Sequence, residues 1–339
     1  MYKAINLSFF TGETTLTPHT KIEDYTDSVA LTKALPLLVF RKFGQKRPIP
    51  KNQGKIIRFT RWGRLSVATT PLTEGVTPAG NTMSYSDITA TLAQYGDWIS
   101  ITDRVTLLSI DPILTEAVSQ LGYQEGETMD TLSRDNLMTG TNAIYATGAA
   151  RNAVLDKITL ASIQKAVRAL KVAMAKPIMK QVNATPKYST SPIRPSYIGV
   201  CHVYAEQDIE DLAGFVPVEN YAAQNDVMEG EFGSVAGVRF IATTQGFESL
   251  GGGATSSTVK NTAGKADVYA TIIFGEDAYG EVPLSGQSSA VIVKAPSWTD
   301  STNTADPLNQ RSSAGWKAFM AFAILNDLWL ARIEHAVSL

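Results

Sequence analysis

Residues 230–240 have the sequence GEFGSVAGVRF, the most distinctive stretch of this chain. The stretch is rich in glycine, but it lacks the GxGxxG spacing and the Gly-Lys-Ser/Thr ending that place backbone amides around a phosphate group. Glu229 and Glu231 flank its first glycine and would repel phosphate. We therefore interpret it as a turn that leads into a strand over residues 238–241.

Short apolar segments surround this stretch and are separated by turn-rich sequence. Further strands are predicted at residues 197–200, 268–274 and 290–293, and a helix at 205–212. A Gly/Ser/Thr loop at 251–265, expected to be mobile, and a Pro/Ser/Thr-rich linker at 181–196 interrupt them. Residues 318–336 predict two apolar strands hinged near Asn326 and Asp327, with helix as the competing interpretation because alanine is frequent. Separate helices and strands of this kind predict an α+β fold.

The first part of the chain has few signals of regular structure. Pro36, Pro48 and Pro50 punctuate residues 1–54, so we expect an extended arm with one short helix. Residues 55–105 predict a long β-hairpin, opened by apolar residues at 56–59, closed by those at 99–105, and tipped by the turn-rich residues 71–81. A lone two-stranded hairpin is marginal in water, so we expect it to lean on another subunit.

Two helices are predicted after the hairpin. Asp111 and Pro112 suit the N-cap and first positions of a helix that continues to about residue 138, roughly 40 Å at 1.5 Å per residue. Gly122 and Gly126 weaken this helix and predict a bend. The second helix is expected over residues 160–175, before Pro177, and its apolar stripe is Ile163, Val167, Leu170 and Met174.

The composition excludes several classes of protein. Hydrophobic residues make up 44% and charged residues 18% of the 339 residues, which argues against wholesale disorder. The net charge of −2 is unlike that of a dedicated polyanion binder. The one cysteine, Cys201, cannot form an internal disulfide. The chain start lacks the apolar core of a signal peptide, and polar residues interrupt the most apolar stretch, 316–333, so we expect no membrane association.

Charge is segregated along the chain. Between residues 28 and 73 there is no Asp or Glu, and the basic residues are Lys33, Arg41, Lys42, Lys46, Arg47, Lys51, Lys55, Arg58, Arg61 and Arg64. The long helix is acidic, with only Arg134 opposing Asp111, Glu116, Glu125, Glu127, Asp130 and Asp135. The basic segment could contact nucleic acid or an acidic surface of a neighbouring subunit, and we favour the neighbour. The candidate assembly interface is therefore Arg41, Lys42, Arg47, Arg58, Arg61, Trp62, Arg64, Glu116, Glu125, Glu127 and Asp130, with Phe40, Phe43 and Trp62 burying apolar area on neighbours.

No catalytic, cofactor or metal site is predicted. The three histidines, His19, His202 and His335, form no metal-binding motif, and Cys201 and His202 would point to opposite faces of a strand. An acidic region without Lys or Arg comprises Glu206, Asp208, Glu210, Asp211, Glu219, Asp226, Glu229 and Glu231. A carboxylate pair for acid–base chemistry or a cation site is conceivable there, but we favour a solvated face or a ring of like charge at a symmetry axis.

The order of these elements resembles the Hong Kong 97-type fold of tailed-bacteriophage major capsid proteins. Residues 220–240 resemble the "GE-hydrophobic-G-x-x-x-G-V-R" signature of one phage capsid family, and residues 306–311, 315–317 and 323–327 resemble its C-terminal signature. The resemblance implies an N-terminal arm at residues 1–54, an extension loop at 55–105, a peripheral domain with a spine helix at 106–195, an axial domain at 196–290 and a return to the peripheral domain at 291–339.

The function implied by the resemblance is structural. The chain would self-assemble into pentamers and hexamers of an icosahedral head that encloses double-stranded DNA by non-specific contact, in the virion, after assembly in the host cytoplasm. Scaffolding, portal and decoration proteins are the implied partners. An encapsulin-like compartment shell is the alternative with the same fold, and an enzyme or a soluble nucleic-acid-binding protein are alternatives of other classes.

One departure from the family bears on shell chemistry. Some members of the fold weld subunits through a lysine on the extension loop, whereas no lysine occurs here between Lys55 and Lys157. We expect a shell without such crosslinks. The chain also has no room for a long N-terminal scaffolding segment, so a separate scaffolding protein is expected.

Overall fold

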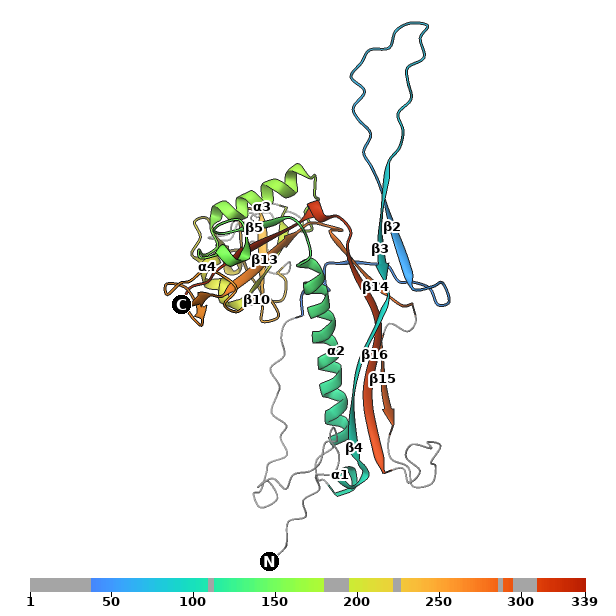
Figure 1. The fold of residues 1–339 in the computed structure, drawn as a ribbon, viewed down its shortest axis with the longest axis vertical. Coiled ribbons are helices and arrows are strands. Elements are labelled where there is room, and N and C mark those ends of the chain that lie inside the picture. Colours follow the sequence, from blue (N-terminus) through green and yellow to red (C-terminus); the bar gives the residue numbers. More distant parts are fainter. Residues whose placement is uncertain (1–37, 109–112, 180–194, 222–226, 286–288, 295–309) are drawn as a thin grey trace, which may run out of the picture.

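The computed structural model describes residues 38–108, 113–179, 195–221, 227–285, 289–294 and 310–339. The fold is α+β: two β-sheets lie on either side of a long helix, and a hairpin projects far beyond both (Figure 1). The predictions for Asp111, Pro112, Asp226 and residues 1–37, 181–194 and 306–309 concern positions outside the described residues.

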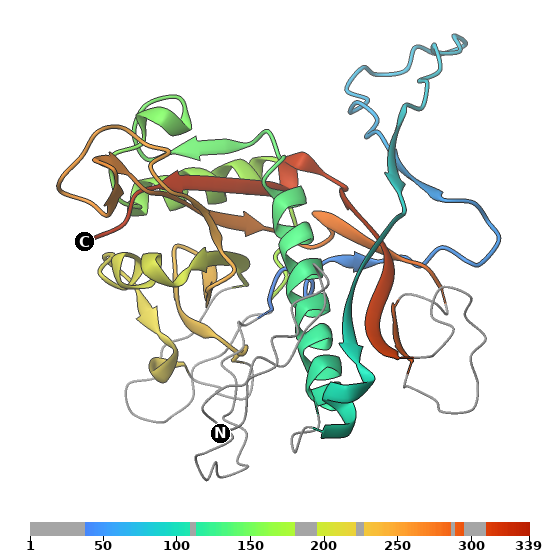
Figure 2. The same cartoon turned by 60° about the horizontal axis from the view of Figure 1, so that its bottom comes forward.

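The first sheet is built on the long strand β16 (Arg311–Ile324). Along one edge of β16 lie β14 (Tyr279–Pro283) and β15 (Ser289–Lys294), and along the other lies β4 (Ala93–Thr102). Helix α2 (Ile113–Leu137) packs on one face of this sheet, where Leu121 and Met129 meet Trp316 and Met320. The short helix α1 (Asp103–Leu108) follows β4, and Figure 2 shows α2 between the two sheets.

Helix α2 continues through both glycines without a break, so a bend there does not interrupt it. A Cβ at Gly126 would lie 2.9 Å from Leu38 Cδ1, so glycine here makes room for the arm that crosses the helix. No described atom lies within 4 Å of a Cβ at Gly122.

The second sheet has the strand order β5-β17-β13-β6-β9-β8-β7, with β10 also paired to β13. These strands are β5 (Ala143–Tyr145), β6 (Tyr197–His202), β7 (Val216–Pro217), β8 (Glu231–Val235), β9 (Val238–Thr243), β10 (Phe247–Ser249), β13 (Val268–Phe274) and β17 (Leu330–His335). Every residue of β6 and β13 is buried, as expected for strands covered on both faces.

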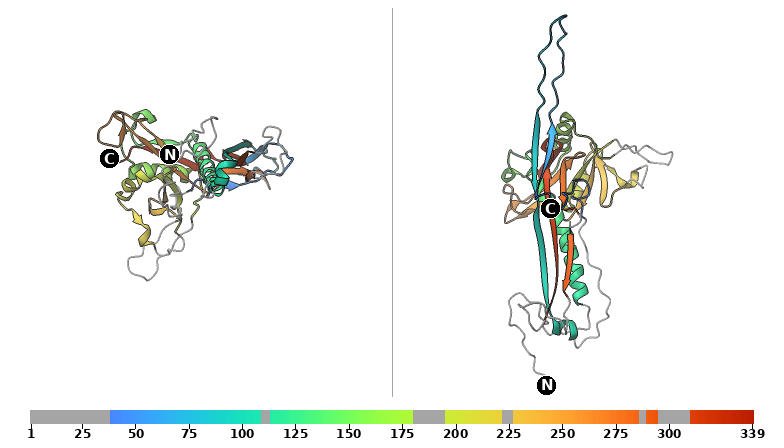
Figure 3. Two further views of the ribbon diagram at one scale, coloured as in Figure 1. Left: turned by 90° about the horizontal axis from the view of Figure 1, so that it is seen from below. Right: turned by 90° about the vertical axis from the view of Figure 1, so that its right-hand side faces the viewer.

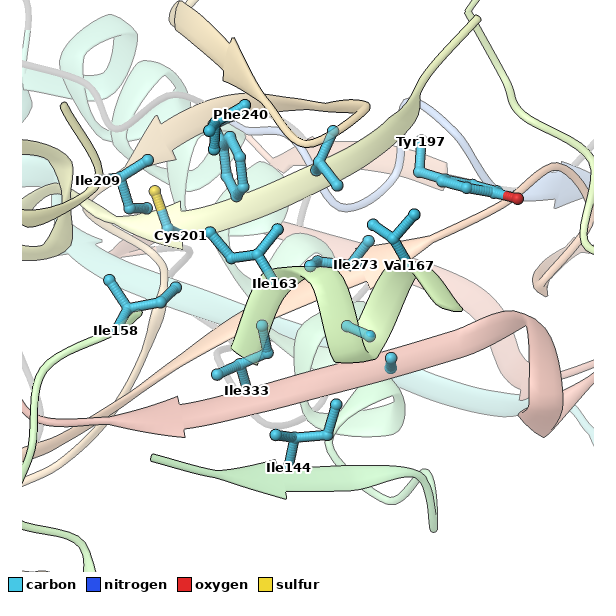
Figure 4. Packing of buried hydrophobic residues seen from close by; sticks show 14 of the residues in the cluster. Ile144, Ile158, Ile163, Val167, Tyr197, Cys201, Ile209, Phe240, Ile273 and Ile333 are labelled. Carbon is cyan, nitrogen blue, oxygen red and sulfur yellow. The ribbon is translucent and has the colours of Figure 1, made fainter. Parts of the chain in front are cut away.

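Helix α3 (Leu160–Val172) covers one face of the second sheet, and its stripe of Ile163, Val167 and Leu170 packs into the main core (Figure 4). Thr159 forms a capping box with Ser162 at the start of the helix. The prediction that Met174 continues the stripe is wrong. The helix ends at Val172, and Met174 adopts a left-handed φ of 56° that leaves its side chain 61% exposed.

The remaining elements are short. Helix α4 (Glu206–Glu210) follows β6, and the two-residue strands β11 (Asn261–Thr262) and β12 (Lys265–Ala266) pair within the predicted loop. Single 3-10 turns lie at Arg151–Ala153, Val203–Ala205, Val218–Asn220 and Asp327–Trp329. The last of these turns carries the chain from β16 in one sheet to β17 in the other, which confirms the two predicted C-terminal strands and their hinge.

The projecting hairpin consists of β2 (Ile56–Trp62) and β3 (Tyr85–Thr91), paired from Ile56–Thr91 to Trp62–Tyr85. Residues 63–84 form the long loop at its end, and the right-hand view of Figure 3 shows how far this loop extends. The predicted closing strand of the hairpin is wrong. Ile99 and Ile101 belong to β4, which pairs with β16, and Val105 belongs to α1. The local alternation of apolar residues fits either partner, so it does not specify the pairing.

The described end of the arm packs on its own subunit. β1 (Gln45–Lys46) pairs in parallel with β14. Phe40 is 1% exposed, its carbonyl accepts a hydrogen bond from Tyr279 Oη at 2.5 Å, and Phe43 packs against Phe274 with ring centroids 5.8 Å apart. The expectation that Phe40 buries its ring on a neighbour is therefore wrong, because the subunit's own core contains it. Phe43 packs against the same core and is partly buried.

Candidate assembly interface

Two of the three predicted interface residues of the arm, Arg41 and Lys42, form ion pairs within the subunit. Arg41 Nε donates to the buried carboxylate of Glu281 at 3.0 Å, and Lys42 Nζ lies 3.1 Å from Glu229 Oε2 at the surface. The backbone amide of Arg47 donates to the Glu281 carbonyl, whereas its side chain is exposed. Of these three predicted interface residues, Lys42 and Arg47 are exposed and Arg41 is partly buried.

Asp130 differs most from its predicted role. It lies on α2 with 0% exposure, and its carboxylate accepts hydrogen bonds from the backbone amides of Val39 at 3.3 Å and Arg41 at 3.2 Å. Burial raises the pKa of Asp130 above its ordinary value, although these amides and the Arg41 charge oppose the shift. Asp130 therefore anchors the subunit's own arm and is not available to a neighbour.

The other acidic candidates on α2 remain at the surface. Glu116 is exposed and accepts a hydrogen bond from Gln120 one turn later at 3.2 Å. Glu125 and Glu127 are partly buried. With about 3.6 residues per turn, Glu116 and Glu127 lie on one side of α2 and Glu125 lies on the opposite side.

The hairpin carries the largest set of exposed candidates. Arg58 is paired across the strands with Asp87 at 3.4 Å, while Arg61 is exposed and Arg64 Nη1 lies 3.3 Å from Met174 Sδ. The Trp62 ring is 60% exposed and lies 5.6 Å from the Tyr85 ring.

The hairpin is also apolar along its length. The exposed large apolar side chains of this hairpin, each at least half exposed, are Ile56, Trp62, Leu65, Val67, Leu72, Val76, Met83 and Tyr85. Large exposed apolar side chains at eight positions of one projection favour a protein–protein contact over a solvated loop. These side chains, together with Arg61 and Arg64, are called the hairpin surface below.

Sequence reasoning missed a second exposed apolar surface at the edge of the first sheet. Val291, Ile292 and Val293 on β15 are each more than 40% exposed, and Trp98 on β4 is 66% exposed. Gly315 lies between Ile292 and Trp98 across β16, and a Cβ there would meet Trp98 Cβ at 2.9 Å. The β-branched residues of β15 indicated a strand in the sequence. They did not indicate that its side chains are exposed, because exposure depends on which other elements cover the strand.

The signature at residues 230–240 has a structural role. Arg239 and Glu231 are buried and form a two-point ion pair, with distances of 2.5 Å from Nε to Oε1 and 2.6 Å from Nη2 to Oε2. Tyr221 Oη and the Met228 amide donate to the same carboxylate at 2.9 and 3.0 Å. The predicted turn is confirmed at Ala236 and Gly237, which link β8 to β9.

The acidic region is more divided than a solvated face or a ring of like charge. Glu231 is in the buried pair, Asp208 is buried beside Lys157 at 3.3 Å, and Glu229 pairs with Lys42. Glu210 and Asp211 remain exposed. Within the described ranges, no group of three or more His, Cys, Asp or Glu side chains is placed to hold a metal ion.

Cys201 and His202 do not form a reactive pair. The Cys201 thiol is 0% exposed and points toward the Ile241 carbonyl at 3.6 Å, and burial raises its pKa. His202 stacks on Tyr204 at 5.0 Å, and burial lowers its pKa. Both shifts favour the uncharged forms, which suits a packing role.

Comparison with known proteins identifies the family. The family model described as "Phage capsid protein" matches residues 85–333. A search of curated protein sequences finds no match. No helix in the described part of the chain is both long and apolar enough to cross a membrane.

The fold is similar to solved phage capsids at low sequence identity. The capsid of Ralstonia phage GP4 is 11% identical with a TM-score of 0.66, covering 100% of this chain and 99% of that one. The capsid of cyanophage P-SCSP1u is 12% identical with a TM-score of 0.61, covering 93% of each chain. The capsid of cyanophage Pam1 is 11% identical with a TM-score of 0.59, covering 97% of this chain and 100% of that one. The architecture is thus the Hong Kong 97-type fold, and the protein belongs to the phage capsid protein family, as a structural subunit that associates with its own copies to form the shell of a phage head.

Proposed function

We propose that the chain builds pentamers and hexamers of an icosahedral head in which each hairpin surface lies on the neighbouring subunit. The observation that carries the proposal is the hairpin itself, whose exposed apolar side chains have no cover within the described part of their own subunit. Burial of apolar area contributes roughly 25 cal/mol per Å², so a ring of such contacts holds each subunit at several places at once.

The partner proposed for the hairpin is helix α2 of the adjacent subunit, on the side that carries Glu116 and Glu127. Arg61 and Arg64 carry exposed positive charge on the hairpin, while Glu116 and Glu127 lie on that side of the helix. Charge pairs of this kind steer docking and fix the register more than they add affinity. Arg41 and Asp130 are not part of the proposed interface, because their side chains bond to Glu281 and to the arm's backbone amides within the same subunit.

The division of the chain follows the same proposal. Residues 1–54 serve as the arm, and 55–105 as the extension loop, whose last part, β4, attaches it to the first sheet. Residues 106–195 and 291–339 serve as the peripheral domain, and 196–290 as the axial domain around the five- and sixfold axes. Gly122, Gly126 and the bases of the hairpin are hinge candidates for expansion of a precursor shell. Assembly takes place in the host cytoplasm with separate scaffolding and portal proteins and, on the finished shell, a decoration protein.

The proposed head holds double-stranded DNA by non-specific contact, and no catalytic step is needed to build it. A near-neutral chain, at net charge −2, suits a container better than a dedicated DNA binder. Subunits are held without covalent crosslinks, because no lysine lies between Lys55 and Lys157 to serve on the hairpin.

Electron microscopy of the purified, overexpressed protein tests the proposal. Closed shells, tubes or ring-shaped capsomers are expected, and featureless monomers at high protein concentration would contradict it. On a denaturing gel, boiled particles are expected to run as one monomer band. A ladder of covalent oligomers would refute the absence of crosslinks.

A further inference from the structure

The second sheet carries a basic groove beside α3. The groove has a volume of about 870 Å³ and lies between the exposed side of α3 and the turn from β8 to β9. Gln164, Arg168 and Lys171 line one wall, and Val216, Ser234 and Gly237 line the other. No Asp or Glu is among the lining residues of this groove in the described chain, and Arg168 and Lys171 are both exposed.

The groove and the exposed acidic residues of α4 lie at different ends of the same strand. Tyr197, which lines the groove, begins β6, whereas α4 follows the other end of β6. Figure 4 shows Tyr197 and Val167 at one end of the core. Cys201 of β6 and Ile209 of α4 lie at the other end. Glu210 at the end of α4 and Asp211 after it are exposed, and neither lines the groove.

We propose that Glu210 and Asp211 of one subunit dock into the basic groove of the next copy around each ring. This inference rests on the proposed assembly into rings and names one of the contacts within them. A groove and a complementary projection at different places on one chain form a head-to-tail contact, and such contacts generate closed rings when the rotation closes. An isologous pairing of two grooves would instead place like charges together.

The charge arrangement favours a second copy over a nucleic acid as the occupant. A phosphate backbone would be attracted by Arg168 and Lys171 but repelled by the acidic end of α4 on the same lobe. The chain has a net charge of −2. The positive charges of Arg168 and Lys171 in each groove are matched by the negative charges of Glu210 and Asp211 on each copy. Because exposed charges steer encounters and are screened by salt, the contact should set assembly rate and register.

A charge-swap series on the full-length chain tests the contact. The first variant carries Arg168→Glu and Lys171→Glu, the second carries Glu210→Lys and Asp211→Lys, and the third carries all four substitutions. We expect each double variant to lower the yield of assembled particles at low salt by about tenfold or more, and the quadruple variant to recover most of it. Light scattering and electron microscopy measure the yield.

Matched controls separate this contact from general charge effects. Lys165→Glu lies on the same helix outside the groove, and Glu219→Lys changes an exposed acid elsewhere on the lobe; both should assemble as the unmodified chain does. A folding defect would not be repaired by adding two more substitutions, so recovery in the quadruple variant is diagnostic. Normal assembly of the double variants, an unrecovered quadruple variant or equally defective controls would overturn the inference. Failure of the unmodified chain to assemble would instead count against the proposed function.

Discussion

At the scale of single residues, the buried pair of Arg239 and Glu231 explains why both charges stand in the 230–240 stretch. Their two-point contact joins neighbouring strands β8 and β9, and the Tyr221 hydroxyl also donates to Glu231. The sequence predicted the turn and the strand but placed Glu231 on a solvated acidic face. The partners of the pair lie within about ten residues of Glu231, but the pattern of the sequence does not show that the pairing of β8 with β9 buries both charges.

Arg239→Met should destabilise the subunit by about 3–5 kcal/mol, since it leaves the Glu231 carboxylate buried without its partner. Chemical denaturation followed by tryptophan fluorescence measures the loss. Adding Glu231→Gln to this variant should recover part of it, because the uncompensated charge is then removed. A loss below about 1 kcal/mol in the single variant would show that the pair is not enclosed.

His335 gives the fold a dependence on pH. The ring is 0% exposed, lies 2.9 Å from Thr271 Oγ1 through Nε2, and burial lowers its pKa. In the unfolded chain its pKa returns to about 6.5. Below about pH 6.5 the His335 ring therefore takes up a proton in the unfolded state more readily than in the folded state. The contribution of His335 to the free energy of unfolding is complete above about pH 6.5 and is lost as the pH falls toward the pKa of the folded state.

Thermal melts of the unmodified chain should thus show falling stability between about pH 7 and 5. His335→Gln should be less stable at pH 7.5, because the hydrogen bond to Thr271 changes, but its melting temperature should vary less over the same interval. Equal pH slopes for the two chains would exclude His335 as the cause.

Ala236 is a position where the chain accepts strain. It has a φ of 54° in the two-residue turn between β8 and β9, and Gly237 follows with a φ of 83°. Asparagine tolerates the left-handed region better than alanine, so Ala236→Asn should stabilise the subunit by about 0.5–1 kcal/mol. Ala236→Val should act in the opposite direction because its branched Cβ crowds this conformation. The urea midpoints of the two variants measure the effects, and a shift of the same sign in both would contradict this explanation.

At the scale of elements, period and composition predicted β6, β9, β13, β15, β16 and β17 and the helices α2, α3 and α4, but missed α1 and strands such as β8 and β14. The predicted strand at 268–274 coincides with β13, and α3 begins at Leu160 as expected from its stripe. Pairing was harder, because β3 and β4 form one nearly continuous extended segment whose first half pairs with β2 and second half with β16. A strand's partner depends on residues more than 200 positions away, which no local pattern encodes.

The junction of the arm with α2 depends on Asp130. Asp130→Ala should cost about 1–3 kcal/mol, because the amide of the buried Val39 loses its acceptor. It should also free the arm, so trypsin should cut sooner after Arg41 or Lys42. Asp135→Ala removes an exposed acid from the same helix and serves as the control. Equal digestion rates for the two variants would mean that Asp130 does not anchor the arm.

At the scale of the whole molecule, the subunit is complete in its core and incomplete at its surface. The described arm packs its buried apolar residues into the subunit's own core, so the arm is a part of the subunit and not only a bridge between subunits. The hairpin surface is different, because its large apolar side chains are each at least half exposed. The ribbon of the hairpin extends beyond the rest of the subunit (Figure 1). The sequence predicted a projection that needs a neighbour, but it could not separate Phe40, which the subunit covers, from Trp62, which it leaves exposed.

The proposed function requires that the neighbouring subunit covers the hairpin surface in the assembled shell. Thiol labelling of the Leu72→Cys variant is the most direct test of this requirement. Leu72 is 77% exposed in the single subunit, while the native Cys201 is 0% exposed and serves as an unreactive internal reference. We expect a maleimide to label the new thiol at least about tenfold more slowly in assembled particles than in dissociated subunits, as burial at an interface requires. Equal labelling rates in the two states would contradict the account, because the hairpin would then remain in solvent after assembly.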